Sequence, residues 1–123
     1  MHRHIRYSLA KANDCFDRDK RKITAFTIRT TDGTDENYSS KRAEAKGTTI
    51  TEELIRFSLV SYERVKADPT EEGNEVIDIK QPYDHFDEWS TKARNFVVAA
   101  WKRISTPDET EIADFFGSAT ESA

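Results

Sequence analysis

Apolar residues recur at steps of three and four between Tyr83 and Ile104. They are Phe86, Trp89, Ala93, Phe96, Val97, Ala100, Trp101 and Ile104. At about 100° per residue these side chains share one arc of about 140°, with polar residues opposite them. Both tryptophans of the chain lie in this stretch. Because large aromatic side chains bury the most surface, the pattern predicts a central amphipathic helix over 83–104, onto which the other helices pack.

Alternation of apolar and polar positions predicts strands. Residues 22–30, KITAFTIRT, are β-branched and aromatic and form the clearest strand of the chain. Residues 75–80, EVIDIK, alternate as a shorter strand, with 22–30 as its candidate partner. Ile5, Tyr7 and Leu9 alternate with polar neighbours, so residues 4–10 are either a short edge strand or part of a flexible basic arm over 1–22.

Capping signals predict two helices before the acidic loop over 67–74. Thr34 is placed to cap a helix that ends at Gly47 and carries few apolar residues, so it should lie on the surface. Thr49 and Glu52 form a capping box that opens a second helix. The apolar face of that helix consists of Leu54, Ile55, Ser58, Leu59 and Tyr62, with Phe57 at its margin.

The sequence TPDE at 106–109 predicts a second capping box, which opens a last helix with Pro107 at its first position. Its apolar face consists of Ile112, Phe115 and Phe116, and Gly117 is expected to end it. Residues 117–123 are small and polar and are expected to form a disordered tail.

Together these elements predict an α+β fold, mostly α, with about four helices packed on the helix over 83–104 and a small antiparallel sheet or hairpin. Residues 23–116 are expected to form a single globular domain. The predicted structural core consists of Leu54, Leu59, Phe86, Trp89, Phe96, Val97 and Trp101.

Composition narrows the class of protein. Of 123 residues, 36% are hydrophobic and 34% are charged, which indicates a thin core. No apolar run approaches the ~20 residues that span a bilayer, so we expect a cytoplasmic protein without membrane contact. Cys15 is the single cysteine, which excludes an internal disulfide and every multi-cysteine zinc site.

Charge is distributed unevenly along the chain. Residues 1–30 carry eight Lys or Arg against three Asp, whereas residues 105–123 carry five acidic residues and no Lys or Arg. This layout is compatible with charge-steered contact with protein partners or other copies of the chain. It is equally compatible with charges that only keep a small domain soluble. Nucleic-acid binding through the basic residues of 1–22 is an alternative function, opposed by the acidic pI of about 5.4.

Candidate chemistry is sparse. His2 and His4 lie at a terminus and His85 has only carboxylates at helical spacing, so converging metal ligands are not predicted. Asp14, Asp17 and Asp19 lack the glycine and later glutamate of a calcium loop. No nucleophile elbow or glycine-rich phosphate loop occurs, so the sequence favours a non-enzymatic protein without a cofactor.

The order of the segments FTIRTTDGTDE, KRAEAKG, ITEELIRFSLVSYE, QPYDHFDEWSTKARNFVVAAWKRI and PDETEIADFF resembles the tail assembly chaperones of long-tailed bacteriophages. The resemblance covers residues 23 to 116. Its most specific part is Phe86-Asp87-x-Trp89, Arg94 and Ala100-Trp101.

The resemblance implies a host-cytoplasmic protein, absent from the mature virion, that keeps the tape measure protein soluble while tail tube subunits assemble around it. Further partners implied are the tail tube protein, a frameshifted longer form of the chain, and further copies of the chain itself. The candidate client-binding residues are Phe57, Ile112, Phe115 and Phe116. The alternative of another class is a permanent virion component, such as a tail or connector subunit.

Overall fold

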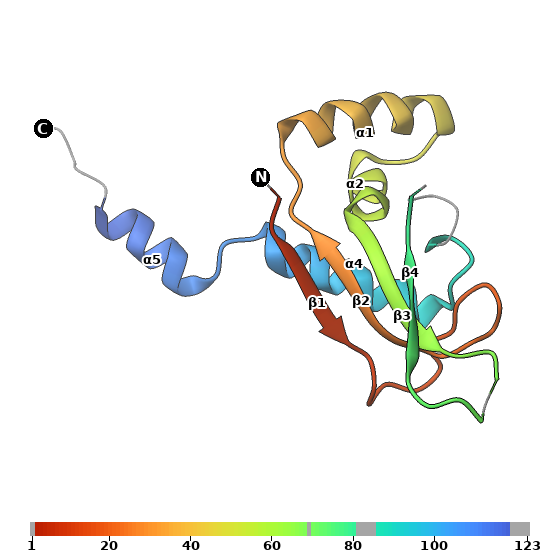
Figure 1. Cartoon of the computed structure of the whole chain (residues 1–123). Helices are drawn as coiled ribbons and strands as arrows, with labels where there is room; N and C mark the ends of the chain where they lie inside the picture. Colours follow the sequence, from red (N-terminus) through yellow and green to blue (C-terminus); the bar gives the residue numbers. More distant parts are fainter. Residues whose placement is uncertain (1, 69, 81–85, 119–123) are drawn as a thin grey trace, which may run out of the picture.

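The protein is built on a four-stranded antiparallel sheet with the strand order β1-β2-β3-β4 (Figure 1). The structure is a computed structural model that describes residues 2–68, 70–80 and 86–118. The strands are β1 (His4–Ser8), β2 (Ile23–Arg29), β3 (Leu59–Val65) and β4 (Asn74–Asp78). The helices are α1 (Gly33–Lys46), α2 (Ile50–Ser58), α4 (Thr91–Ser105) and α5 (Glu109–Ser118).

The helices take different positions around the sheet (Figure 1). Helices α1 and α2 connect β2 to β3 and lie beyond one end of these strands. Helix α4 crosses behind the sheet, and α5 extends away from it. The expectation of about four helices packed on a central helix is therefore wrong, because the antiparallel sheet is the element that the rest of the fold surrounds.

One face of the sheet is apolar and carries the core. Tyr7, Phe26, Tyr62 and Ile77 are neighbours across the four strands and join the same apolar cluster. The adjacent set of cross-strand partners has side chains on the opposite face of the sheet. It consists of Arg6, Thr27, Ser61 and Asp78. An antiparallel sheet with one apolar and one polar face needs cover on one side only, and α4 supplies it.

Helix α4 accounts for the second part of the predicted helix over 83–104. Helix α4 starts at Thr91, and residues 81–85 lie outside the described part of the chain. Trp89 precedes the helix in a turn, in which its backbone N–H donates to the Phe86 carbonyl at 3.2 Å. The three- and four-residue spacing thus continues through a turn that is not helical.

The contact of α4 with the sheet is made by small side chains. Ala93 and Val97 are fully buried and Ala100 is nearly so, which lets the helix backbone approach the strands closely. Phe96 was expected in the core, but it is 38% exposed because it lies about 100° around the helix from Val97. Trp101 is only partly buried at the margin of the apolar cluster. The other expected core residues are buried, namely Leu54, Leu59, Phe86, Trp89 and Val97.

The second predicted helix is shorter than its apolar face suggested. Helix α2 ends at Ser58, and Leu59 and Tyr62 are buried from strand β3 instead. Thr27 pairs with Ser61 and Ile28 with Leu59, so Val60 is an extra residue and the strand bulges there. The bulge places Leu59 and Tyr62 on the same face at a spacing of three, which imitates a helix.

The strand predictions hold with one change of partner. Strand β2 matches the expected strand, and β1 shows that residues 4–8 are the edge strand rather than an arm. Strand β4 forms as predicted, but it pairs with β3 and not with β2. Strand β3, whose residues were expected to continue the second helix, lies between β2 and β4.

The local cap signals are partly confirmed. Thr49 and Glu52 form the expected capping box, and Gly47 ends α1 with a φ of 69°, in the left-handed region that favours glycine. Asp32, not Thr34, caps α1, because its side chain accepts from the Asp35 backbone N–H. Helix α5 runs to Ser118, so Gly117 and Ser118 belong to its last turn and not to the expected tail, whose residues 119–123 lie outside the described part of the chain.

A buried polar cluster fastens the segment after β1 to the sheet. The Asp17 carboxylate accepts from the Tyr62 hydroxyl at 2.9 Å, from Arg64 at 2.7 Å, and from the backbone N–H groups of Asp19 and Arg21. Burial opposes ionisation, but these donors hold the pKa of Asp17 below its usual value. The same burial and the Asp17 charge raise the pKa of Tyr62.

We expect Trp89→Ala to cost roughly 3–5 kcal/mol of unfolding free energy, because Trp89 is 3% exposed and leaves a large cavity. Trp101→Ala should cost about half as much, because Trp101 is only partly buried. Urea unfolding monitored by circular dichroism measures both variants. Equal losses, or a larger loss for Trp101→Ala, would contradict the placement of Trp89 at the centre.

Asp17→Asn should cost roughly 2 kcal/mol at pH 7, because it weakens the charge-assisted hydrogen bonds from Tyr62 and Arg64, although Arg64 keeps its ion pairs with Asp19 and Glu75. A carboxyl group with a lowered native pKa stabilises the fold above its unfolded pKa of about 3.9 and loses this effect as the pH falls through the native pKa. The difference in unfolding free energy between wild type and variant should therefore shrink below about pH 4. Urea unfolding at several pH values measures it, and a pH-independent difference would refute the ionic role of Asp17.

Candidate protein-binding surface

Helix α5 is set apart from the body by an extended connection and by its own cap. Thr106 has extended dihedrals, φ −115° and ψ 128°, and Pro107 follows. The Asp108 carboxylate accepts from the Glu111 backbone N–H at 2.8 Å, and the Glu111 carboxylate accepts from the Asp108 backbone N–H at 3.3 Å. This capping box starts α5 at Glu109 without help from the sheet.

The apolar face of α5 is exposed. Ile112 is 42% exposed, Phe115 68% and Phe116 69%, and the two phenylalanine rings meet edge to face at 5.3 Å. Three large apolar side chains on one exposed helix make this face a candidate protein-binding surface, because soluble domains rarely leave such groups together in water. The structure thus brings together three of the four residues that the sequence singled out as client-binding.

Phe57, the fourth candidate, takes a structural position instead. Its ring lies 5.2 Å from the Tyr38 ring, and the Arg29 guanidinium lies 4.9 Å from the ring centre. Phe57 is half-buried between α1 and the end of β2 and does not join the surface of α5.

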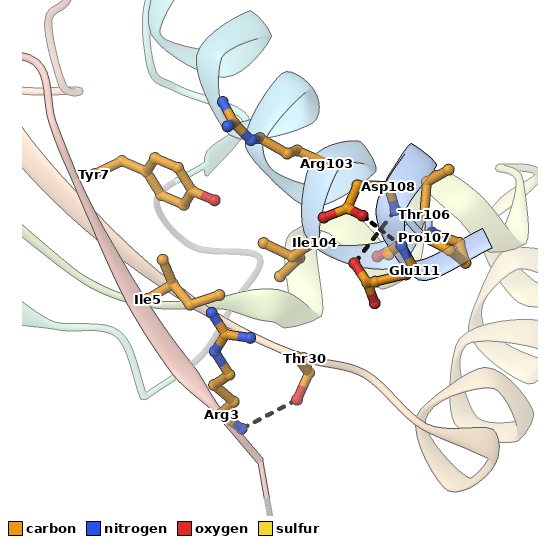
Figure 2. A pocket seen from close by; sticks show the side chains of 11 residues that line it. Arg3, Ile5, Tyr7, Thr30, Arg103, Ile104, Thr106, Pro107, Asp108 and Glu111 are labelled. Carbon is orange, nitrogen blue, oxygen red and sulfur yellow. Dashed lines mark hydrogen bonds between the residues drawn. The ribbon is translucent and has the colours of Figure 1, made fainter. Parts of the chain in front are cut away.

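A cleft opens where β1 meets the end of α4 (Figure 2). Its volume is about 460 Å³. Ile5 and Tyr7 extend from β1 toward Ile104 of α4, while Arg3 and Arg103 lie at opposite sides (Figure 2). The connection to α5 forms its remaining wall with Thr106, Pro107, Asp108 and Glu111.

This cleft continues along α4 as a groove. A hollow of about 270 Å³ shares Tyr7 and Arg103 with the cleft and adds Phe96 and Ala99 of α4. A shallower hollow of about 240 Å³ then reaches Lys92. We call this continuous depression the β1–α4 groove. Its lining was not foreseen from the sequence, because Phe96 was placed in the core and the edge-strand alternative for residues 4–10 was left undecided.

Three of the seven Lys and Arg residues of 1–22 are paired with carboxylates. Arg6 contacts Glu63 through two hydrogen bonds of 2.6 and 3.1 Å, Arg21 is ion-paired with Glu75, and Arg18 lies 3.9 Å from Glu88. These pairs neutralise charge that phosphate contacts would need, so they weaken the alternative of nucleic-acid binding.

The fold also gathers His2, Asp32 and Asp35, whose potential ligand atoms lie within 4.8 Å of one another. Arg29 donates to Asp35 at 2.9 and 3.1 Å and thereby lowers its pKa. The guanidinium already supplies the positive charge that a cation would bring, so this cluster serves as the polar start of α1. Sequence spacing could not reveal it, because residue 2 meets residues 32 and 35 only across the β1–β2 pair.

Comparisons with protein-family models, with curated proteins and with solved structures found no match to this chain. Within residues 2–68, 70–80 and 86–118, no helix is both long and apolar enough to cross a bilayer. The surface of α5 and the β1–α4 groove are therefore the features from which function is inferred.

The Cys15 thiol should resist labelling in the native protein. Cys15 is fully buried, and burial raises its pKa, so both access and thiolate content are low. We expect dithionitrobenzoate to react with it only as fast as the chain unfolds. In guanidinium chloride the reagent should titrate the one thiol of each chain at once, which serves as the control. Rapid labelling in native buffer would show that the segment around Cys15 opens freely.

Proposed function

We propose that this protein is a non-catalytic tail assembly chaperone of the kind found in long-tailed bacteriophages, and that it binds the tape measure protein through α5. The observation that carries the proposal is the exposed apolar face of Ile112, Phe115 and Phe116 on a helix that extends from the folded body. The protein acts in the host cytoplasm and leaves before the virion is complete.

An amphipathic helix is suited to binding a tape measure protein. A tape measure protein is long and helical, and its apolar stripes aggregate before the tail tube covers them. An α5-like helix covers such a stripe with its own apolar face, in the manner of helix-in-groove recognition. The acidic residues of α5, Glu109, Glu111 and Asp114, repel neighbouring complexes and keep the client soluble.

The test is co-expression of this chain with the tape measure protein encoded beside it, followed by measurement of soluble client. We expect the client to be soluble only in the presence of the wild-type chain. The double variant Ile112→Ser/Phe116→Ser should weaken binding at least about tenfold, because apolar anchors carry most of the affinity of such contacts.

Val76→Ser is the matched control. Val76 is 63% exposed on strand β4, so its replacement removes a similar apolar surface away from α5. This variant should keep the client as soluble as wild type does. A client that stays insoluble with the wild-type chain would refute the proposal, and recovery of the chain in purified virions would identify it as a permanent structural component.

A further inference from the structure

We propose that α5 of one copy of this chain docks in the β1–α4 groove of a second copy, and that the exchange is reciprocal. The resulting dimer covers the exposed face of α5 and fills the groove at once. This inference goes beyond the proposed function and holds for any client. It does make the second copy a competitor of the client, because both use Ile112 and Phe116.

The groove has the chemistry that an acidic amphipathic helix requires. Its floor is apolar and is formed by Ile5, Tyr7, Phe96, Ala99 and Ile104. Its rim carries the basic residues Arg3, Arg103 and Lys92, and its end near α5 also carries the acidic residues Asp108 and Glu111. Phe96 is a large apolar side chain left 38% exposed there, which is the counterpart of the exposed phenylalanines on α5.

Helix α5 carries the opposite charge. Its acidic residues are Glu109, Glu111 and Asp114, and no Lys or Arg occurs after Arg103. Apolar residues against an apolar floor, and carboxylates against Arg3, Arg103 and Lys92, give complementarity of both kinds.

The lengths agree. The groove follows α4 from Lys92 to Ile104, a distance of about 18 Å at 1.5 Å per residue. Helix α5 has ten residues and is about 15 Å long. One α5 therefore covers most of the length of the groove.

The connection before α5 favours a second copy over the helix's own groove. Thr106 is extended, and the capping box of Asp108 and Glu111 fixes the start of α5 in a direction away from the sheet (Figure 1). The same connection forms one wall of the groove's wide end. In a two-fold symmetric dimer, α5 of each copy can thus dock in the groove of the other copy. This is the self-complementary arrangement of common homodimers.

The test is sedimentation velocity of the full chain over a wide range of concentration. We expect a monomer–dimer equilibrium. Ile112→Asp/Phe116→Asp alters the helix, Phe96→Asp/Ala99→Asp alters the groove, and Val76→Asp is the matched control on β4. Each of the two double variants should raise the dimer dissociation constant at least about tenfold, whereas Val76→Asp should leave it unchanged. Circular dichroism confirms that the variants, all at exposed positions, remain folded.

Mixing the two double variants distinguishes docking of α5 in the groove of another copy from docking of α5 in its own groove. The mixture pairs one intact groove with one intact α5, so heterodimers should form although neither variant dimerises alone. A wild-type chain that stays monomeric at every concentration would overturn the inference, and so would a mixture that gives no heterodimer. Because the assay contains no client, its outcome is independent of the chaperone test.

Discussion

The contact of Asp17, Tyr62 and Trp89 joins three parts of the chain that are distant in sequence. The Tyr62 hydroxyl donates to Asp17 at 2.9 Å, and the Tyr62 ring meets the Trp89 ring edge to face at 4.9 Å. Just beside it, the Ser90 hydroxyl accepts from the Phe16 backbone N–H and donates to the Asp14 carbonyl. The segment after β1 therefore holds β3 on one side and the start of α4 on the other. This joint fixes the start of α4, and the buried Ala93 and Val97 then hold the helix against the apolar face of the sheet.

The elements that could be predicted are those specified by neighbouring residues alone. The capping box of Thr49 and Glu52, the stop at Gly47 and the alternation of β2 involve only a few consecutive positions. The end of α2 depends instead on pairing between β2 and β3. The bulge in that pairing gives Leu59 and Tyr62 the spacing of a helix. The local pattern therefore favoured a longer helix, whereas pairing with β2 favoured a strand. The long-range hydrogen bonds prevailed.

The candidate site was predicted in part, and two aromatic residues show why. Phe57 was expected near the surface, but the sequence could not show that Arg29 and Tyr38 enclose it. Phe96 was expected in the core, but the sheet is reached through Ala93 and Val97, and Phe96 faces the groove. Periodicity identifies the apolar side of a helix, whereas the partner element decides which part of that side is covered.

The position of Gly117 within α5 adds an energetic consequence. A helix of about ten residues without tertiary support is marginal in water, and a glycine in its last turn weakens that end further, because glycine loses the most backbone entropy on becoming helical. Ordering of α5 is thus coupled to whatever surface it contacts, and part of the contact energy is offset by the loss of backbone entropy. The affinity of any contact that α5 makes therefore depends on how far this segment is helical beforehand, as well as on the area of its apolar face.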